Sequence, residues 1–176
     1  MSRLRGPATF VPAVLLIAIA LCSCKNRQTS GDSPQTDTPA SPTAEAAAVR
    51  GWIQSVAVDV TQTGPEAWLK YFDDSPSFFM ANNGSMAFPN GAAAQDGTKK
   101  FAATISHIEV KWGDDIRVNV LTPELASVGA PWHEVQIDLK GHRVEEAGYF
   151  TATAEKRGGR WIFRDVHWSM PLPPAR

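Results

Sequence analysis

The sequence predicts an α+β domain in which helices come first and an antiparallel sheet follows. Apolar residues recur at helical spacing over residues 46–60 and again after Pro65. From about residue 108 onward, short turns separate segments that are typical of strands. Hydrophobic residues make up 43% and charged residues 20% of the 176-residue chain, which indicates a globular domain rather than a disordered or fibrous chain.

Three helices and one hairpin are expected before the sheet. The first helix, Ala46–Val60, ends where Gly64-Pro65 breaks the pattern, and a second short helix runs from Pro65 to about Phe72. Asn82-Asn83-Gly84 lies between two short apolar runs and predicts a hairpin, because Asn-Gly adopts positive φ at low cost. Residues 91–105 are expected to form the third helix.

Five strands are expected to follow, at residues 108–112, 115–121, 125–139, 142–155 and 160–169. Residues directly opposite in an antiparallel pair point to the same face, so the position of each turn decides which residues face inward. We centre the turns on Pro123-Glu124, Lys140-Gly141 and Gly158-Gly159. One face then gathers aliphatic and aromatic side chains and is expected to pack against the helices: Ile116, Val118, Val120, Val135, Ile137, Leu139, Phe150, Ala152, Ala154, Trp161 and Phe163.

Residues 1–23 are typical of a secretory signal peptide. Two arginines precede the apolar stretch Phe10–Leu21, which is shorter than the roughly 20 residues that a bilayer span needs. Its end, Leu21-Cys22-Ser23-Cys24, resembles the lipobox of bacterial lipoproteins, in which cleavage precedes a lipid-carrying cysteine. The small Ser23 favours Cys24 over Cys22 as that cysteine. The resemblance implies membrane attachment through a lipid on Cys24 and an extracytoplasmic place in a bacterial cell envelope; a plain secretory signal is the alternative.

Residues 24–45 contain no aromatic and no large aliphatic side chain, and they are rich in Pro, Ser, Thr and Asp. Such a segment cannot bury enough apolar area to offset its ordering entropy. The predicted organisation is therefore a disordered tether at 24–45, one domain at 46–170 and a short tail at 171–176.

Charge and motifs exclude several classes of function. A formal net charge of -1 argues against a strongly basic nucleic-acid binder. The two cysteines, Cys22 and Cys24, fall at the end of the signal region, which excludes a disulfide framework and a cysteine-based zinc site. The sequence contains no P-loop, dinucleotide glycine motif or Ser-His-Asp motif, and no cofactor or metal is expected.

The segments IRVNVLTPELASVGAPW and GYFTATAEKRGGRW and the closing HWS, placed after helices, resemble the SnoaL-like branch of the nuclear transport factor two superfamily. The resemblance covers about residues 46–170. It implies a cone-shaped fold in which a curved antiparallel sheet wraps around about three helices and a cavity, often with a homodimer through the outer sheet face. Members include polyketide cyclases, ketosteroid isomerases, dehydratases and many proteins without known activity, so the fold does not decide the function.

Polar groups on the predicted apolar face are the candidates for catalysis. The assumed strand pairing places Asp165 and His167 there, beside His133 and Glu146. Burial in an apolar cone shifts the pKa of such groups, as acid–base catalysis requires. The alternative is that Asp165 and His167 merely hydrogen-bond each other or the helix ends. No spacing signature supports a metal site built from His133, His167 and Glu146.

Aromatic side chains provide candidate ligand-binding residues. With His133 and Glu146, these are Trp68, Phe72, Phe79, Phe150 and Phe163, which suit a small apolar molecule, although the same rings could simply form a core. The pairing gathers Trp132, Tyr149 and Trp168 on the outer face, and that patch predicts a homodimer or partner surface.

Three functions compete at this stage. The favoured one is a membrane-anchored extracytoplasmic lipoprotein whose SnoaL-like domain binds a small apolar ligand or a protein partner without catalysis. The alternatives are a lyase, isomerase or cyclase with Asp165 and His167 as its acid–base pair, and a structural dimerisation module. The volume of the cavity and the residues that line it are the observations that separate these functions.

Overall fold

The computed structural model describes residues 41–171. The elements are α1 (Pro42–Thr63), the 3-10 helix η1 (Pro65–Lys70), β1 (Phe79–Asn82), β2 (Ser85–Phe88), α2 (Gly91–Ala102), β3 (Ile105–Trp112), β4 (Arg117–Thr122), β5 (Leu125–Asp138), β6 (Arg143–Arg157) and β7 (Arg160–Ser169). The predicted signal peptide with Cys24, most of the predicted tether and most of the tail lie outside the described residues. Within residues 41–171, no helix has the length and apolar character needed to cross a membrane.

Helix α1 begins earlier than predicted, so residues 42–45 are helical rather than part of a tether. The hydroxyl of Ser41 accepts a hydrogen bond from the backbone N–H of Ala44 at 3.2 Å, and a proline occupies the first turn. Glu45 is only 7% exposed and accepts a hydrogen bond from Lys156 Nζ at 3.2 Å. The helix ends at Gly64, whose φ of +93° favours glycine.

The hairpin and the second α-helix form as predicted. Asn83 and Gly84 have φ values of +48° and +80°, the positive values expected for an Asn-Gly hairpin turn. Asn90 caps α2 by accepting a hydrogen bond from the N–H of Ala93 at 2.8 Å. This helix ends at Ala102, before the predicted residue 105, because Ile105 already pairs with Asp138 as the start of β3.

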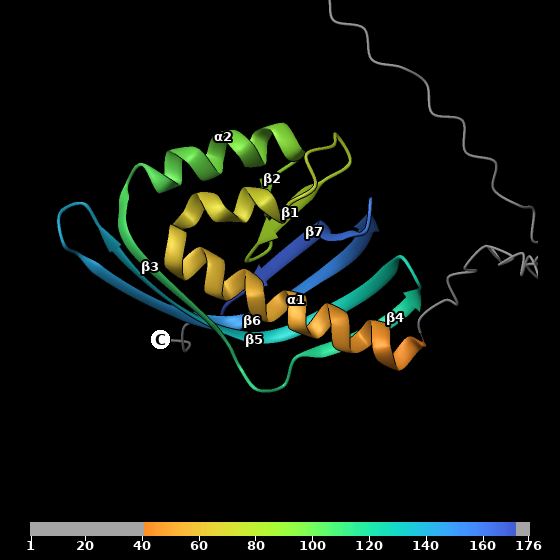
Figure 1. The fold of residues 1–176 in the computed structure, drawn as a ribbon. Coiled ribbons are helices and arrows are strands. Elements are labelled where there is room, and N and C mark those ends of the chain that lie inside the picture. Colours follow the sequence, from red (N-terminus) through yellow and green to blue (C-terminus); the bar gives the residue numbers. More distant parts are fainter. Residues whose placement is uncertain (1–40, 172–176) are drawn as a thin grey trace, which may run out of the picture. The chain divides into compact units, whose positions relative to one another are not determined.

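The strands form one seven-stranded sheet in the order β2-β1-β7-β6-β5-β3, with β4 paired to the first part of β5. The pairing of β1 with β7 is parallel, whereas the other strand pairs of the described chain are antiparallel. Figure 1 shows the curved sheet with α1, η1 and α2 on its concave side. The predicted α+β class is confirmed, with a mixed, mostly antiparallel sheet.

The core lies between α1 and the concave face of the sheet. Val49, Ile53 and Val56 of α1 are fully buried there. The Trp52 ring lies 4.6 Å from the Phe163 ring of β7, and the Trp112 indole N–H donates to the backbone carbonyl of Ile53 at 2.8 Å. These contacts hold α1 close against the sheet.

The turn between β5 and β6 is one residue longer than predicted. The residues of β5 that were expected to point inward therefore point outward, and the reverse. The Asp138 carboxylate accepts hydrogen bonds from the N–H groups of Lys140 at 2.7 Å and His142 at 2.9 Å, and Gly141 has a φ of +85°. The chain therefore turns over residues 139–141 instead of a two-residue turn, and Ile137 pairs with Arg143. The even-numbered residues of β5 face inward, so the inward positions predicted for Val135, Ile137 and Leu139 are wrong.

Strand β7 contains a β-bulge that reverses its second half. Phe163 lies opposite Ala154, but the next pair is Asp165 with Thr153, so Arg164 is the extra residue. On the other side of β7, the N–H of Phe163 donates to the carbonyl of Tyr71 at 2.6 Å, and the N–H of Asp73 donates to the carbonyl of Phe163 at 2.8 Å. The chain leaving η1 thus pairs with β7 next to the bulge. Beyond it, Val166 and Trp168 face inward.

Candidate functional site

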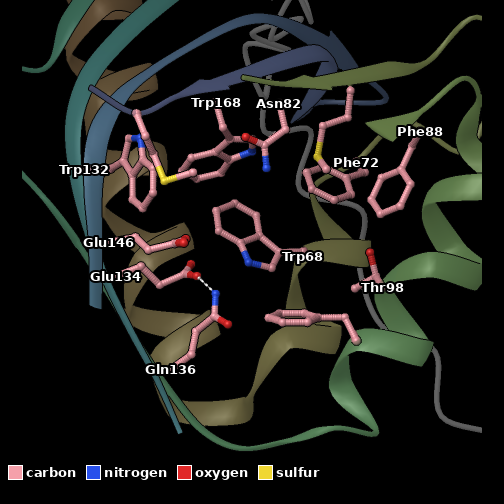
Figure 2. Close-up of a pocket in the computed structure, with 13 residues that line it drawn as sticks. Trp68, Phe72, Asn82, Phe88, Thr98, Trp132, Glu134, Gln136, Glu146 and Trp168 are labelled. Carbon is pink, nitrogen blue, oxygen red and sulfur yellow. Dashed lines mark hydrogen bonds between the residues drawn. The ribbon is translucent and has the colours of Figure 1, made fainter. Parts of the chain in front are cut away.

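A cavity of about 310 Å³ lies between η1, α2 and the concave face of the sheet. That volume is at the lower end of the range for small-molecule sites. Its lining residues are Trp68, Phe72, Met80, Asn82, Phe88, Thr98, Phe101, Trp132, Glu134, Gln136, Glu146, Trp168 and Met170. Figure 2 shows these side chains around the cavity.

One wall of the cavity is polar and comes from two neighbouring strands. Glu134 and Gln136 follow Trp132 along β5 at alternate positions, so all three side chains point to the same face. Glu146 of β6 lies directly opposite Glu134 in the strand pair. The Gln136 side-chain amide donates a hydrogen bond to the Glu134 carboxylate (Figure 2).

The position of Glu134 changes its acidity. Burial raises the pKa of its carboxyl, the hydrogen bond from Gln136 lowers it, and the nearby Glu146 carboxylate raises it again, with a net upward shift. Glu146 makes no hydrogen bond or ion pair with any residue between 41 and 171. The polar wall therefore holds two carboxylates and no basic group.

The opposite wall is aromatic. Trp68 belongs to η1, which begins at Pro65 with its proline in the first turn. Its ring stacks on Phe72 at a centroid distance of 5.6 Å and meets the edge of Trp168 at 5.5 Å. Trp168 in turn makes an edge contact with Trp132 at 5.1 Å. In Figure 2 the Trp68 ring stands across the cavity from Glu134, Gln136 and Glu146.

Three predicted ligand-binding residues line the cavity: Trp68, Phe72 and Glu146. Phe150 and Phe163 are fully buried in the core instead and do not reach the cavity. Phe79 points outward from β1 and is 41% exposed, so its predicted position in a pocket is wrong.

The predicted catalytic pair is not in the cavity. The bulge at Arg164 turns Asp165 and His167 to the outer face of β7, where His167 is exposed. Neither side chain forms a hydrogen bond with another residue in the described part of the chain, so the structure brings together neither the proposed acid–base pair nor a bonded Asp–His unit. Their predicted inward orientation is wrong.

His133 and the outer-face aromatics are also placed differently from the prediction. His133 faces outward, and its Nε2 lies 2.7 Å from Oε1 of Glu145. Trp132 and Trp168 line the cavity, which leaves Tyr149, 38% exposed, as the single member of the predicted aromatic patch on the outer face. Two of the three rings that suggested a homodimer surface are therefore not on the outer face. The homodimer stays a prediction.

Position 148 requires glycine because the backbone of β7 passes very close to it. A Cβ at this position would lie 1.8 Å from the carbonyl oxygen of Ser169, at the end of β7. The end of β7 thus fills the space beside Gly148. The neighbouring indole N–H of Trp132 is buried without a hydrogen-bond partner among residues 41–171.

Glu134, Gln136, Trp132 and Trp168 are the functional candidates that the sequence reasoning assigned to the wrong face. Glu134, Gln136 and Trp132 alternate along β5, and a two-residue turn between β5 and β6 puts all three outside. Trp168 of β7 falls outside when the bulge at Arg164 is not counted. Among residues 41–171, no group of three or more His, Cys, Asp or Glu side chains is arranged to hold a metal ion.

Comparison with known proteins identifies the fold. No family model matches the chain, and no curated protein matches its sequence. Among solved structures, a nuclear transport factor 2-like superfamily protein from Salmonella enterica is similar with a TM-score of 0.62 and 16% identity, covering 77% of this chain and 96% of that one. A nuclear transport factor 2-like protein of unknown function from Shewanella oneidensis has a TM-score of 0.56 and 19% identity, covering 73% and 98%. A hexachlorocyclohexane dehydrochlorinase from Novosphingobium barchaimii has a TM-score of 0.56 and 13% identity, covering 74% and 91%.

These likenesses establish the architecture. The domain has the nuclear transport factor 2-like α+β fold, with N-terminal helices against a curved, mostly antiparallel sheet. At such identities the likeness concerns the fold alone, and function must be argued from the cavity.

Proposed function

We propose that this domain binds a small, mostly apolar organic molecule in the cavity without transforming it, and that a lipid on Cys24 anchors the protein in a bacterial cell envelope. The observation that carries the binding function is the cavity itself. Aromatic rings from η1, α2 and the sheet surround about 310 Å³ of space, with a few polar groups on one side. Apolar walls with a small number of convergent polar groups are the usual composition of small-molecule sites.

A titration tests the binding function. The single-ring alcohol 2-phenylethanol serves as probe, and isothermal calorimetry measures its affinity. Phe101→Ala removes a lining ring and is expected to weaken binding about tenfold. Phe79→Ala is the matched control, because this exposed ring is outside the cavity and its loss should leave affinity unchanged. Equal affinity of the probe for the two variants would contradict the proposal.

Acid–base catalysis on the bound molecule is the second candidate function. With Asp165 and His167 outside, Glu134 is the group that would act, since burial raises its pKa and a proton acceptor or donor in an apolar cavity is suited to that chemistry. A ketone probe in D₂O distinguishes the two functions by NMR. Exchange of the hydrogens next to the carbonyl that is lost in Glu134→Gln supports catalysis, whereas bound ketone without exchange supports binding alone.

The anchoring proposal is supported by the sequence Leu21-Cys22-Ser23-Cys24 at the end of the apolar stretch. In bacterial expression, Cys24→Ser is expected to move the protein from the membrane to the soluble extracytoplasmic fraction. Cys22→Ser is the matched control and should leave the protein with the membrane. A Cys24→Ser protein that still sediments with membranes after a salt wash would overturn the anchoring proposal.

A further inference from the structure

We propose that the molecule bound in the cavity is an organic cation, an ammonium group on a small apolar or aromatic body. The inference rests on the proposed binding function and adds the charge of the ligand to it. Three features of the cavity support it: the sign of its charged groups, the lack of a partner for one of them, and the aromatic rings that face them.

The ionisable side chains of the cavity wall are all acidic. Glu134 and Glu146 come from β5 and β6, and the lining residues of η1, α2, β1, β2 and β7 include no Lys, Arg or His. The cavity can therefore carry negative charge that no basic side chain of its wall neutralises. Such a cavity favours a cationic ligand and disfavours an anionic one.

Glu146 differs from two other glutamates of β6, Glu145 and Glu155. Glu145, next to Glu146 on β6, forms an ion pair with Arg143 on the outer face, and its Oε1 lies 2.7 Å from Nε2 of His133. Glu155 farther along the strand pairs with Arg157 at 2.9 Å. Glu146 has no such partner within residues 41–171, although it lies opposite another carboxylate. A ligand cation would supply the missing counter-charge.

The aromatic rings suit the same ligand. Trp68 lies across the cavity from the carboxylates, Trp168 lies next to Trp68, and Trp132 lies on the side of Glu146 (Figure 2). Aromatic faces attract cations, most strongly tryptophan faces, and the attraction grows where water is excluded. A bare metal ion would gain little from these walls, because hard cations need several oxygen ligands. An ammonium with an apolar body fits both walls.

Three probes with the same ring and different charge test the inference: 2-phenylethylammonium, 2-phenylethanol and phenylacetate. At neutral pH and low salt, calorimetry should give an affinity for the ammonium at least about tenfold higher than for the alcohol, and the weakest binding for phenylacetate.

Two neighbouring glutamates of β6 provide matched variants. Glu146→Gln should remove most of the preference for the ammonium over the alcohol, and Glu134→Gln should reduce the same preference. Glu145→Gln makes the same change of charge on the outer face and should preserve the preference. Comparable circular dichroism spectra would show that all three variants fold.

The outcomes separate this inference from the proposed function. Equal binding of ammonium and alcohol, or a preference that survives in both cavity variants, overturns the cationic ligand while cavity binding stands. A preference lost equally in Glu145→Gln also overturns it, since general surface charge would then be the cause. Failure of all three probes to bind contradicts both proposals.

Discussion

The concave face of the sheet has a closed half and an open half, and the same two strands supply both. In the closed half the inward side chains are all buried: Ala126, Val128 and Ala130 of β5, and Phe150, Ala152 and Ala154 of β6. In the open half the strands continue around the cavity with Trp132, Glu134 and Gln136 of β5 and Glu146 of β6. One strand geometry thus gives close packing at one end and a cavity at the other.

The difference comes from side-chain size and from the helix above. Small alanines let α1 approach, so that Val49, Ile53 and Val56 fill the closed half completely. Above the open half, η1 and α2 present the large rings of Trp68 and Phe101, which line the cavity. In this domain the open half thus combines large rings above the sheet with polar side chains on the sheet.

The largest effect on stability is expected from removing one phenyl ring from each half of the concave face. Phe150→Ala should lower the free energy of unfolding by about 3–5 kcal/mol, because Phe150 is fully buried among Trp112, Phe163 and Trp168 and its removal creates a new cavity. Phe101→Ala enlarges a cavity that already exists and should cost about 1–2 kcal/mol. Urea unfolding measures both, and equal costs would contradict the division into halves.

The next test of the two halves concerns the charge of a buried carboxylate, Asp73. Asp73 is fully buried beside Phe163 of the closed half. Burial opposes its ionisation, but hydrogen bonds from the Ser75 hydroxyl and N–H and from Arg157 outweigh this and lower the pKa of Asp73. Asp73→Asn should lower stability by about 2 kcal/mol at neutral pH, because the amide keeps one acceptor oxygen, replaces the other with an NH₂ donor and carries no charge to pair with Arg157. Asp74→Asn, on the exposed neighbour, is the control and should have little effect.

The pH dependence of the Asp73→Asn effect follows from the lowered pKa. The stability that ionised Asp73 contributes is complete above the ordinary pKa of an aspartate and is lost as pH falls through its lower folded-state pKa. The gap between the unmodified protein and Asp73→Asn should narrow in acid. A gap that does not change with pH would show that packing, rather than charge, is responsible.

The smallest expected effect is an increase in stability, from a substitution at Glu134. The pKa of Glu134 is raised in the folded protein, so the ionised carboxylate reduces stability at neutral pH. Glu134→Gln should therefore raise the free energy of unfolding by about 1 kcal/mol or less. As pH falls into the range where folded Glu134 takes up its proton, stability of the unmodified protein rises toward that of the variant. Chemical unfolding at several pH values checks this, and a destabilised Glu134→Gln at neutral pH would contradict it.

The sequence predicted the elements well and the site poorly, and two local details account for the difference. The strands, the Asn83-Gly84 hairpin turn and the helix breaks at Gly64-Pro65 depend on local periodicity and turn chemistry. Trp68, Phe72 and Glu146 lie where expected because their positions did not depend on the length of the β5–β6 turn or on the bulge in β7. Asp165 and His167, in contrast, were assigned to the cavity by counting through a bulge.

What the sequence by itself determined is the order of helices and strands, the α+β class and the resemblance to the SnoaL-like branch. What only the tertiary structure decided is which alternate residues of β5 and β7 face the cavity. Side chains alternate with a period of two, so one additional residue reverses a whole strand segment. The Asp138 carboxylate stabilises the β5–β6 turn that contains one additional residue. The bulge at Arg164 lies where β7 meets the chain leaving η1. The bulge depends on contacts between segments far apart in the sequence, which is why local patterns could not place Trp168 inside and His167 outside.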